Sequence, residues 1–516
     1  MRFNRRQFLV GAGAAAATVP SLSTLLRSKS AAAAIGDTLT IAYHVSPPSW
    51  DPTVGPSSVN PGLQSIYKSV FDQYIEQEPN LAFSPGVLTG WGWNDDKTKV
   101  WMDVREGITW HDGKPLTPAD VVWNLDRVAN KDTGNVVQAV WASAGNLKVE
   151  GNRITGDVVQ YVPDYFKWMA FLTAYLLPPH YYKEVGAAGF EKAPIGSGPY
   201  KVEQFEANGF LRLKRNESYW GGKPAFETVV FKFVADPSSR VAEIESGSSD
   251  LTLEIPFEEF DRLKDKEGLA GVCHPVSDVA MIFFNDVAPL EDPNVRKAMV
   301  LSVDREAIVQ RLLRGYGVPL YTLEAPEYAA FDAGINVPHD PEQAIALLAK
   351  SGYSKDKPVK LTIQTTRGFR PKDYEMIQAV VGMWRKVGIE AEIEVYEIAK
   401  HFELRAQDKL AAAAFYVWGN ASGDPNNSTG FAMWGPSPHS VWDTDDLDGK
   451  LAQVMWGEKD DTKRMAGWKD ALRYIADNDY VLPLLQYYQP VIYKAELNFT
   501  PYVANFVLPH KTSKKA

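Results

Sequence analysis

Residues 359–396 read VKLTIQTTRGFRPKDYEMIQAVVGMWRKVGIEAEIEVY. Apolar and polar residues alternate over 359–363 and again over 389–395, which is the two-residue period of a β-strand. Between them, residues 371–387 have the length and pattern of a helix. Two strands joined by a helix of this length form a crossover with parallel strands. The stretch therefore predicts an α/β lobe, which binds ligands beyond the carboxyl ends of its strands.

Further elements are expected on either side of this unit. Helix starts are predicted at Thr117-Pro118, Asp292-Pro293 and Asp340-Pro341, because each has a capping residue followed by proline at the first helical position. Residues 39–43 form an apolar run, predicted as a strand, that leads into the proline-rich segment 46–52. A strand that ends in an irregular loop is a common place for ligand contacts.

Length and charge narrow the functional classes. A chain of 516 residues is too long for one hydrophobic core, so two or three domains are expected. The net charge is −10, but residues 1–34 carry five basic residues and no acid, so the remainder has 49 basic and 64 acidic residues, a net charge of −15. A nucleic-acid partner is not expected, because phosphate binding needs basic surface.

The first 34 residues have the features of an export signal. The basic pair Arg5-Arg6 precedes an apolar stretch, and four alanines close the segment at 31–34, where a signal peptidase needs small residues. The pair with the following QFL resembles the twin-arginine export motif, with ordinary secretory export as the alternative. Cys273 is the only cysteine, so neither a disulfide nor an N-terminal lipid anchor is expected. We expect a protein free in the periplasm.

Several motifs lie in order along the body of the chain. They are WMDVREGITWHDGKPLTPADV at 101–121, IGSGPY at 195–200 with NESYW at 216–220, and DPNVRKA at 292–298 followed by DR at 304–305. Together they resemble the bacterial extracellular solute-binding proteins of the peptide, nickel and opine class (family 5), which are receptors of ABC importers. The first motif is the most specific, and the resemblance extends over nearly the whole body of the chain.

This resemblance implies an α/β fold of two lobes, a type II periplasmic-binding-protein clamshell, with a small domain inserted in the N-terminal lobe. The implied boundaries are lobe I over 35–56, 178–282 and 488–516, the inserted subdomain over 57–177, and lobe II over 283–487. A small polar solute would bind between the lobes, which close on it and deliver it to a permease and ATPase complex in the inner membrane. A monomer without a cofactor is expected.

The segment WGNASGDP, at 418–425, resembles the family's W-x-x-D-x-x-D-P loop. In peptide-binding members, the first aspartate of that loop pairs with the α-ammonium of the ligand, and here Ala421 occupies its position. Asp424 keeps the second aspartate, which we expect to structure the loop beside Pro425. The residue at 421 counts against ordinary dipeptides, so oligosaccharides, opine-like conjugates and metal chelates stay open beside peptides.

The candidate ligand contacts come from this loop, from the loop after the first strand, and from the expected crossings between the lobes. Tryptophans offer flat faces for stacking, and the other side chains offer hydrogen bonds. The candidates are Ser46, Trp50, Asn285, Trp418, Gly419, Asn420, Ala421, Asp424, Trp434, Tyr487 and Tyr488.

An enzyme is not expected. The pair His111-Asp112 is better explained by a turn at Asp112-Gly113 than by acid–base chemistry. Residues 444–449 are predicted as a solvated acidic loop, because Met455 stands where a calcium loop needs glutamate. The sequence has no Gly-x-Ser-x-Gly elbow or phosphate-binding loop, and its eight histidines do not pair at metal-ligand spacing. A periplasmic glycosidase with two carboxylates and a chaperone-like protein are the remaining alternatives.

Overall fold

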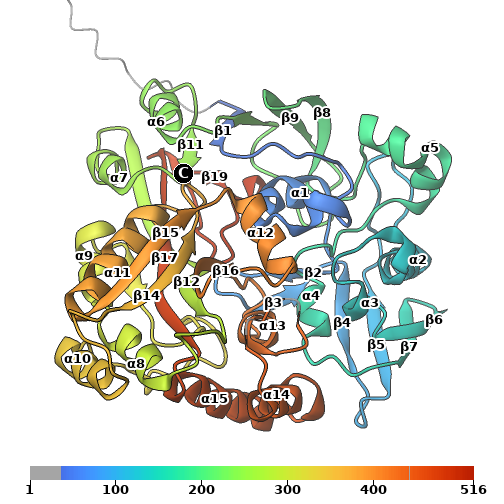
Figure 1. The fold of residues 1–516 in the computed structure, drawn as a ribbon. Coiled ribbons are helices and arrows are strands. Elements are labelled where there is room, and N and C mark those ends of the chain that lie inside the picture. Colours follow the sequence, from blue (N-terminus) through green and yellow to red (C-terminus); the bar gives the residue numbers. More distant parts are fainter. Residues whose placement is uncertain (1–35, 438, 441, 516) are drawn as a thin grey trace, which may run out of the picture. The chain divides into compact units, whose positions relative to one another are not determined.

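A mixed 11-stranded sheet forms the centre of the fold in the computed structural model, which describes residues 36–515 except 438 and 441 (Figure 1). The predicted export signal over 1–34 lies outside the described residues. The strands follow the order β15 (Ile389–Val395), β14 (Val359–Thr365), β16 (Ala413–Gly419), β12 (Leu269–Phe284), β17 (Val481–Lys494), β11 (Leu251–Leu253), β1 (Thr38–Tyr43), β10 (Thr228–Phe233), β9 (Phe210–Arg215) and β8 (Tyr200–Glu206), with β13 (Gly317–Pro319) paired to β17.

Two parallel groups of strands lie on either side of a long antiparallel pair. β1 runs parallel to β10 and β11, and we call this half, with β8 and β9, lobe I. β14 runs parallel to β15 and β16, and we call this half lobe II. The long strands β12 and β17 pair with each other through both halves, with an irregular register between Pro275 and Val279. The two lobes therefore share these two strands.

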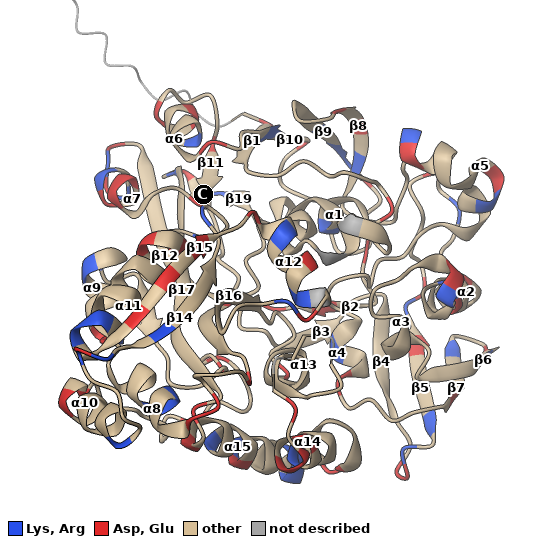
Figure 2. Cartoon of the chain, in the orientation of Figure 1, with Lys and Arg blue, Asp and Glu red and all other residues tan. Residues whose placement is uncertain are grey.

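Helices follow the strands in both halves. Those of lobe I are α1 (Gln64–Val70), α5 (Pro179–Lys192, kinked at Gly186), α6 (Pro237–Glu245) and α7 (Phe257–Leu263). Those of lobe II are α8 (Pro293–Leu301), α9 (Arg305–Leu312), α10 (Pro341–Lys350), α11 (Asp373–Val387), α12 (Ile398–Ala406), α13 (Thr429–Met433), α14 (Asp445–Ala452) and α15 (Asp461–Asp477). Basic and acidic residues are mixed on these helices, without a continuous basic stripe in the view of Figure 2.

A separate small sheet lies between α1 and α5 in the sequence. It has four antiparallel strands in the order β4 (Leu88–Trp93), β5 (Lys99–Val104), β7 (Arg153–Val158) and β6 (Ala144–Glu150). The same part of the chain contains α2 (Pro118–Ala129), α3 (Gln138–Trp141), α4 (Tyr165–Trp168) and the short pair β2 (Ile75–Gln77) and β3 (Phe83–Pro85). The C-terminal end of the chain adds the pair β18 (Leu497–Asn498) and β19 (Ser513–Lys514). We call residues 72–177 the insertion.

The crossover predicted from the opening stretch is confirmed, since α11 connects the parallel strands β14 and β15. The helix begins two residues later than predicted, at Asp373, because Lys372 has a left-handed backbone with φ of 60°. The Asp373 carboxylate instead accepts N–H bonds from Gly368 and Phe369, at 2.9 Å each, and so folds the preceding loop against the helix. The three predicted helix starts are also confirmed in α2, α8 and α10.

The prediction for residues 444–449 was wrong, because the acidic segment is helical. Thr444 precedes α14, and Asp445, Asp446 and Asp448 occupy its first turn. Carboxylates at this position interact favourably with the positive end of the helix dipole and with its free N–H groups. Leu447 and Leu451 supply the buried face, four residues apart. The run of acids therefore marks a helix start rather than a loop.

Two sequence motifs meet where the insertion joins lobe I. His111 and Gly196 exchange two hydrogen bonds: the His111 N–H donates to the Gly196 carbonyl at 2.7 Å, and the Gly196 N–H donates to the His111 ring at 3.0 Å. Gly198 donates to the Val70 carbonyl at 3.0 Å. A Cβ on Gly196 would lie 2.1 Å from that oxygen, so only glycine fits. Asn216 completes the joint with a bond to the Gly198 carbonyl. The motifs are scaffold, and the prediction of a turn after His111 is confirmed by Gly113, with φ of 86°.

Candidate functional site

Polar side chains from both lobes meet at the carboxyl ends of the parallel strands. His44 follows β1, Glu254 follows β11, and Arg370 lies in the loop after β14. The His44 ring is 3.4 Å from the Glu254 carboxylate. Burial lowers the pKa of the Arg370 guanidinium, but the nearby carboxylates of Asp278 and Glu254 favour its charged form. The net effect is a raised pKa. The ends of strands from opposite lobes therefore face a common region, as expected for ligand sites of α/β sheets.

An ion pair between Arg370 and Asp278 lies at the centre of this region. The guanidinium Nε is 2.8 Å from the carboxylate, and the side chains are 26% and 14% exposed. Gly419, at the end of β16, lies against this carboxylate, because a Cβ there would be 2.9 Å from Asp278 Oδ1. The nearby Tyr487 on β17 is 2% exposed, and its hydroxyl has no hydrogen-bond partner among the described residues. A buried hydroxyl without a partner is costly unless something else completes it.

A cluster of aromatic and basic side chains adjoins the ion pair, and we call it the aromatic cluster. Tyr416 and Trp418 are two residues apart on β16 and so lie on one face of the strand. His401 and Arg405 are four residues apart on α12 and share one face of the helix. The His401 ring is parallel to the Tyr416 ring at 5.5 Å, and the Arg405 guanidinium lies 4.9 Å from both Tyr416 and Trp418. Phe369, the residue before Arg370, stacks on Tyr416 at 6.2 Å and links the cluster to the ion pair.

Trp418 and Gly419 are two of the predicted site residues, and both lie beside these groups. The rest of their loop is turned into the protein. Trp418 donates from its indole N–H to the Asn427 carbonyl at 2.6 Å. Asn420 is fully buried, and its amide donates to the Asp424 carbonyl and the Ser428 hydroxyl at 2.9 Å each. The side chains of the loop therefore hold its own backbone.

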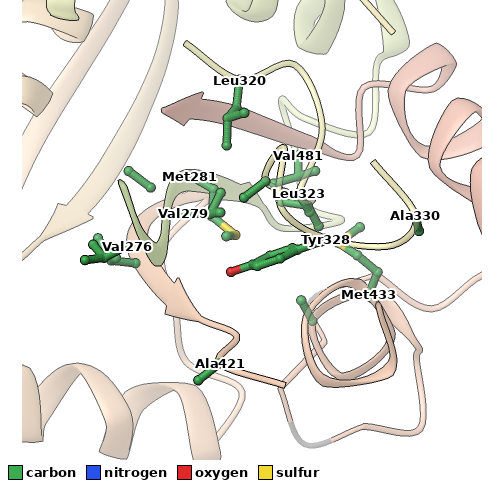
Figure 3. Packing of buried hydrophobic residues seen from close by; sticks show 14 of the residues in the cluster. Val276, Val279, Met281, Leu320, Leu323, Tyr328, Ala330, Ala421, Met433 and Val481 are labelled. Atoms are coloured by element: carbon green, nitrogen blue, oxygen red, sulfur yellow. The ribbon is translucent and has the colours of Figure 1, made fainter. Parts of the chain in front are cut away.

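Ala421 packs into the hydrophobic core rather than facing polar groups. It is 3% exposed and belongs to the buried set around Tyr328, Val279 and Met281 (Figure 3). Its carbonyl accepts a hydrogen bond from the Gln77 amide of the insertion. No carboxylate can be offered from this position to an ammonium group.

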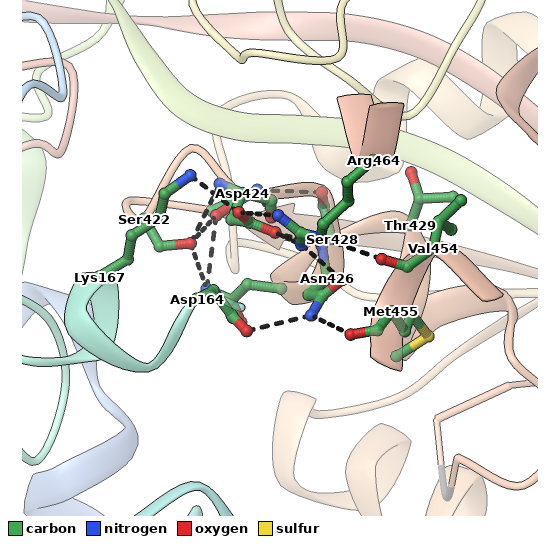
Figure 4. A network of polar contacts seen from close by, with 12 residues as sticks. Asp164, Lys167, Ser422, Asp424, Asn426, Ser428, Thr429, Val454, Met455 and Arg464 are labelled. Atoms are coloured by element: carbon green, nitrogen blue, oxygen red, sulfur yellow. Dashed lines mark hydrogen bonds and ion pairs between the residues drawn. The ribbon is translucent and has the colours of Figure 1, made fainter. Parts of the chain in front are cut away.

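Asp424 lies in a buried network that connects lobe II to the insertion (Figure 4). Its carboxylate is fully buried and accepts two hydrogen bonds from the Arg464 guanidinium, at 3.0 and 2.5 Å, and one from Lys167 at 2.8 Å. Asn426 donates to the Asp164 carboxylate at 3.0 Å. The Lys167 and Arg464 cations hold the pKa of Asp424 low despite its burial. All of its strong acceptor positions are used by protein donors, as expected for a residue that structures the loop.

The remaining predicted residues lie elsewhere in the fold. Ser46 accepts a bond from the Asn208 N–H at 3.2 Å, in the loop after β1. Trp50 is 2% exposed and packs with Tyr67 and Phe205 in the core of lobe I. Asn285 donates to the Leu410 and Ala411 carbonyls beside the first residues of β16, at the opposite end of that strand from Trp418.

Two more predicted residues have surroundings of their own. Trp434 packs against Trp456 at 5.8 Å, and Tyr488 pairs with Pro275 where β12 and β17 lose their regular register. The structure therefore brings Trp418, Gly419 and Tyr487 to the region of the ion pair, and it does not bring Trp50 or Asn285 there.

Sequence reasoning missed most of the polar groups of the site. His44, Glu254, Arg370, His401 and Arg405 belong to no motif that was recognised. One signal was available for two of them, because His44 directly follows the predicted strand over 39–43 and Arg370 lies between the predicted strand and helix of the opening stretch. Glu254 stands out only in the structure, where its backbone is left-handed with φ of 54°. Such a conformation is uncommon for residues other than glycine.

Neither a metal cluster nor a membrane span is found in the part of the chain that the structure describes. Within it, no group of three or more His, Cys, Asp or Glu residues is arranged to hold a metal ion. No described helix combines the length and the apolar character needed to cross a bilayer.

The chain is similar to several proteins of known class. Residues 82–435 match the family model described as "Bacterial extracellular solute-binding proteins, family 5 Middle". The dipeptide-binding protein of Escherichia coli is 27% identical over 368 residues, 66% of this chain and 69% of that protein. The nickel-binding periplasmic protein of the same organism is 24% identical over 489 residues, 88% of this chain and 91% of that protein.

The solved structures agree in fold. The binding protein DppA from Helicobacter pylori, in complex with peptide STSA, superposes with a TM-score of 0.78 at 18% identity, over 93% of this chain and 98% of that one. The architecture is the two-lobed type II periplasmic-binding-protein fold, with a small domain inserted in the N-terminal lobe. With a family model matched over most of its length, the chain belongs to the bacterial extracellular solute-binding proteins of family 5.

Proposed function

We propose that this protein is the receptor of an ABC importer, and that it captures its solute where the strand ends of the two lobes meet. The observation that carries the proposal is the convergence of His44 and Glu254 from lobe I with Arg370 from lobe II, in a chain of a solute-binding family. Solute contacts with both lobes would supply the differential affinity that favours the closed form. Capture without turnover follows, since binding proteins release their solute unchanged.

The solute class is narrowed by the loop at 418–424. Ala421 is buried among apolar groups, so the loop offers no carboxylate to a free α-ammonium. Ordinary dipeptides are therefore disfavoured within the peptide class, which remains the main candidate, with opine-like conjugates, oligosaccharides and metal chelates as the alternatives. Relatives named for dipeptide and for nickel binding differ in their solutes, so kinship alone does not choose among these classes.

For the closing motion, we propose a hinge within the shared strands β12 and β17. The lobe boundaries expected from the sequence, near residues 283 and 487, both fall inside these strands. The interrupted register between Pro275 and Val279 supplies a place where the pair can bend without losing a regular ladder. Lobe I would then comprise the segments expected from the sequence, 35–56, 178–282 and 488–516. We add residues 57–71, which the sequence placed in the insertion, because α1 packs in the same core as β1.

The proposal includes partners and location. The protein would be exported by the twin-arginine route through Arg5-Arg6 and would be a free monomer in the periplasm. It would deliver the solute to a permease and ATPase complex in the inner membrane. Replacing both arginines by lysine should retain the precursor in the cytoplasm, whereas unchanged export would favour the ordinary secretory route.

The proposal is tested by a thermal-shift screen of the exported protein against peptides, oligosaccharides, opines and metal chelates. We expect one class to raise the unfolding temperature in a saturable manner, because a solute that binds only the native state stabilises it by mass action. Product formation from any of these compounds would overturn the receptor proposal. Saturable binding of unfolded chains, without competition by small solutes, would favour a chaperone instead.

A further inference from the structure

The hinge proposed within β12 and β17 is irregular on both edges at the same level. β17 pairs with β13 of lobe II at residues 485–487 and with β11 of lobe I at residues 491–493. Between them, no described strand pairs with residues 488–490 on that edge. On the other edge, the register with β12 becomes irregular directly after the pair of Pro275 and Tyr488. Side-chain contacts between the lobes beside this level therefore bear on the angle between them.

Tyr316, the residue before β13, makes such a contact with α7 of lobe I. Its ring stacks on Phe257 at 5.3 Å and meets Phe260 edge-on at 5.4 Å. Its hydroxyl donates to the Asp261 carboxylate at 2.6 Å. Arg314 donates from Nε to the same carboxylate at 2.7 Å. We call these five residues the α7 contact.

Each side of the α7 contact is fixed within its own lobe. α7 buries Leu263 completely, in a small core that it shares with α6 of lobe I. On the lobe II side, Arg314 and Gly315 have left-handed backbones, with φ of 57° and 86°, and reverse the chain after α9. The Tyr316 N–H then donates to the Leu313 carbonyl at 2.9 Å. The contact therefore joins a helix fixed in lobe I to a turn fixed in lobe II.

The α7 contact and the Asp424 network lie on opposite edges of the pair β12 and β17. α7 and Tyr316 adjoin β11 and β13, which pair with β17. The loop that carries Asp424 follows β16, which pairs with β12, and its Asn420 N–H donates to the Ser277 carbonyl of β12 at 2.9 Å. In Figure 1, α7 and α9 lie on one side of β12 and β17, and α13 lies on the other with α4 of the insertion. A rotation in the plane of the sheet that separates one edge therefore closes the other.

We infer that the α7 contact is a stop that limits how far the two lobes can open. This inference rests on the hinge and the receptor function proposed above. Opening by such a rotation would separate the insertion from lobe II and press Tyr316 into α7, where its ring already touches Phe257 and Phe260. Closely packed atoms are hard to compress, so the rotation ends where this contact is made. A small side chain at position 316 would remove the limit.

The test measures the distance between the insertion and lobe II in the solute-free exported protein. Nitroxide labels are attached through Val149→Cys in the insertion and Gln378→Cys on α11, both exposed positions, in a Cys273→Ala background. Double electron–electron resonance gives the distribution of distances between them. Tyr316→Ala should shift this distribution by several ångströms to longer distances. Tyr316→Phe keeps the ring and should match the parent, as should Tyr353→Ala, which removes a half-buried tyrosine elsewhere in lobe II.

Arg314→Glu is a second variant that removes no buried group, because Arg314 is exposed. Its carboxylate would repel Asp261 and widen the edge beside α7, so the distribution should lose its longest distances. An unchanged distribution for Tyr316→Ala, or a shift to shorter distances, would overturn the inference. Where Tyr316→Ala does not fold, Arg314→Glu decides, and longest distances that are kept or extended would overturn it. These measurements need no solute, so a failed stop leaves the receptor function to be judged by the thermal-shift screen.

Discussion

At the scale of single residues, the pair of Asp424 and Arg464 shows how a motif residue acts. The two side chains are fully buried or nearly so, and the guanidinium binds both carboxylate oxygens. Arg464→Met should lower the free energy of unfolding by roughly 3–5 kcal/mol, because it leaves a buried carboxylate with Lys167 as its one cationic partner among the described residues. Arg473→Met, also on α15, breaks an ion pair with Asp332 in which the arginine is 57% exposed, and should cost less than about 1 kcal/mol. Urea denaturation measures both, and equal losses would contradict this view of Asp424.

Glu324 provides a residue whose ionisation is coupled to folding. It is fully buried, accepts hydrogen bonds from Ser428 and Thr429 through one oxygen, and has a pKa raised by burial to about 7. The folded pKa exceeds the unfolded value of about 4.5, so from pH 4.5 to 7 the native state keeps a proton that the unfolded chain has lost. This group therefore contributes stability at low pH that is lost as pH rises through that window.

Glu324→Gln removes this dependence and keeps the shape of the side chain. Relative to the wild type, the variant should gain of the order of 3 kcal/mol in unfolding free energy between pH 4.5 and 7. Urea denaturation across that range gives the difference directly. Glu390→Gln, at an exposed position of β15, serves as the control and should show no such gain. A flat difference for Glu324→Gln would mean that the carboxyl is ionised in the native state.

Residue-level prediction found the structural role of Asp424 in the loop at 418–425, but it did not find most of the polar groups of the candidate site. Trp418, Ala421 and Asp424 could be read from one contiguous motif. His44 and Arg370 are separated by more than three hundred residues in the sequence and meet only because strands of different lobes end in the same region.

At the scale of elements, the glycines of the IGSGPY motif fix how the insertion joins lobe I. Gly196→Ala would place a Cβ 2.1 Å from the Val70 carbonyl and close to the Phe71 ring. We expect a loss of roughly 1–3 kcal/mol, because the backbone of α1 must move. Gly382→Ala on α11 is the matched control, since a Cβ there would meet nothing within 4 Å, and this change should not lower stability. Thermal unfolding should separate the two variants, and a wild-type melting temperature for Gly196→Ala would refute the close approach.

Element prediction was accurate where local chemistry agrees with the fold. The capping residues and the prolines that follow them predicted the starts of α2, α8 and α10. The alternation of apolar and polar residues predicted β14 and β15. It failed at residues 444–449, where a run of aspartates was taken for a loop although it forms the first turn of α14. Two buried leucines were too few to show a helical period in the sequence.

At the scale of the whole molecule, the insertion is bound to both lobes in the described conformation. Its contacts with lobe II include Lys167 with Asp424, Asn426 with Asp164 and Gln77 with the Ala421 carbonyl. We call these contacts between the insertion and lobe II the seam. Its insertion side holds the acid Asp164 and the base Lys167, and its lobe II side holds the acid Asp424 and the base Arg464. Separation would leave two neutral halves, which lowers the electrostatic cost of opening.

Lys167→Met should therefore favour the open form. Small-angle X-ray scattering of the solute-free protein should give a larger radius of gyration, with weaker solute binding, because the binding-competent form is less populated. Lys99→Met is the control, since Lys99 pairs with Asp157 inside the insertion. If Lys167→Met changes neither the radius nor the affinity, the seam plays no part in closure.

The resemblance of the motifs to the solute-binding family predicted the two lobes. It did not predict which strands pair with each other. Pairing of β12 with β17 joins residues about two hundred apart, and neither strand alternates cleanly because both are largely buried. Only the assembled sheet reveals that these strands carry the connection between the lobes.

Capture of one solute molecule between the lobes, without chemical change, is the central claim. Isothermal titration calorimetry of the exported protein with the solute found by screening, followed by recovery of that solute, tests it most directly. We expect a stoichiometry of about one and recovery of the solute unchanged. Conversion of the solute to product, or the absence of saturable binding by every solute class, would contradict it.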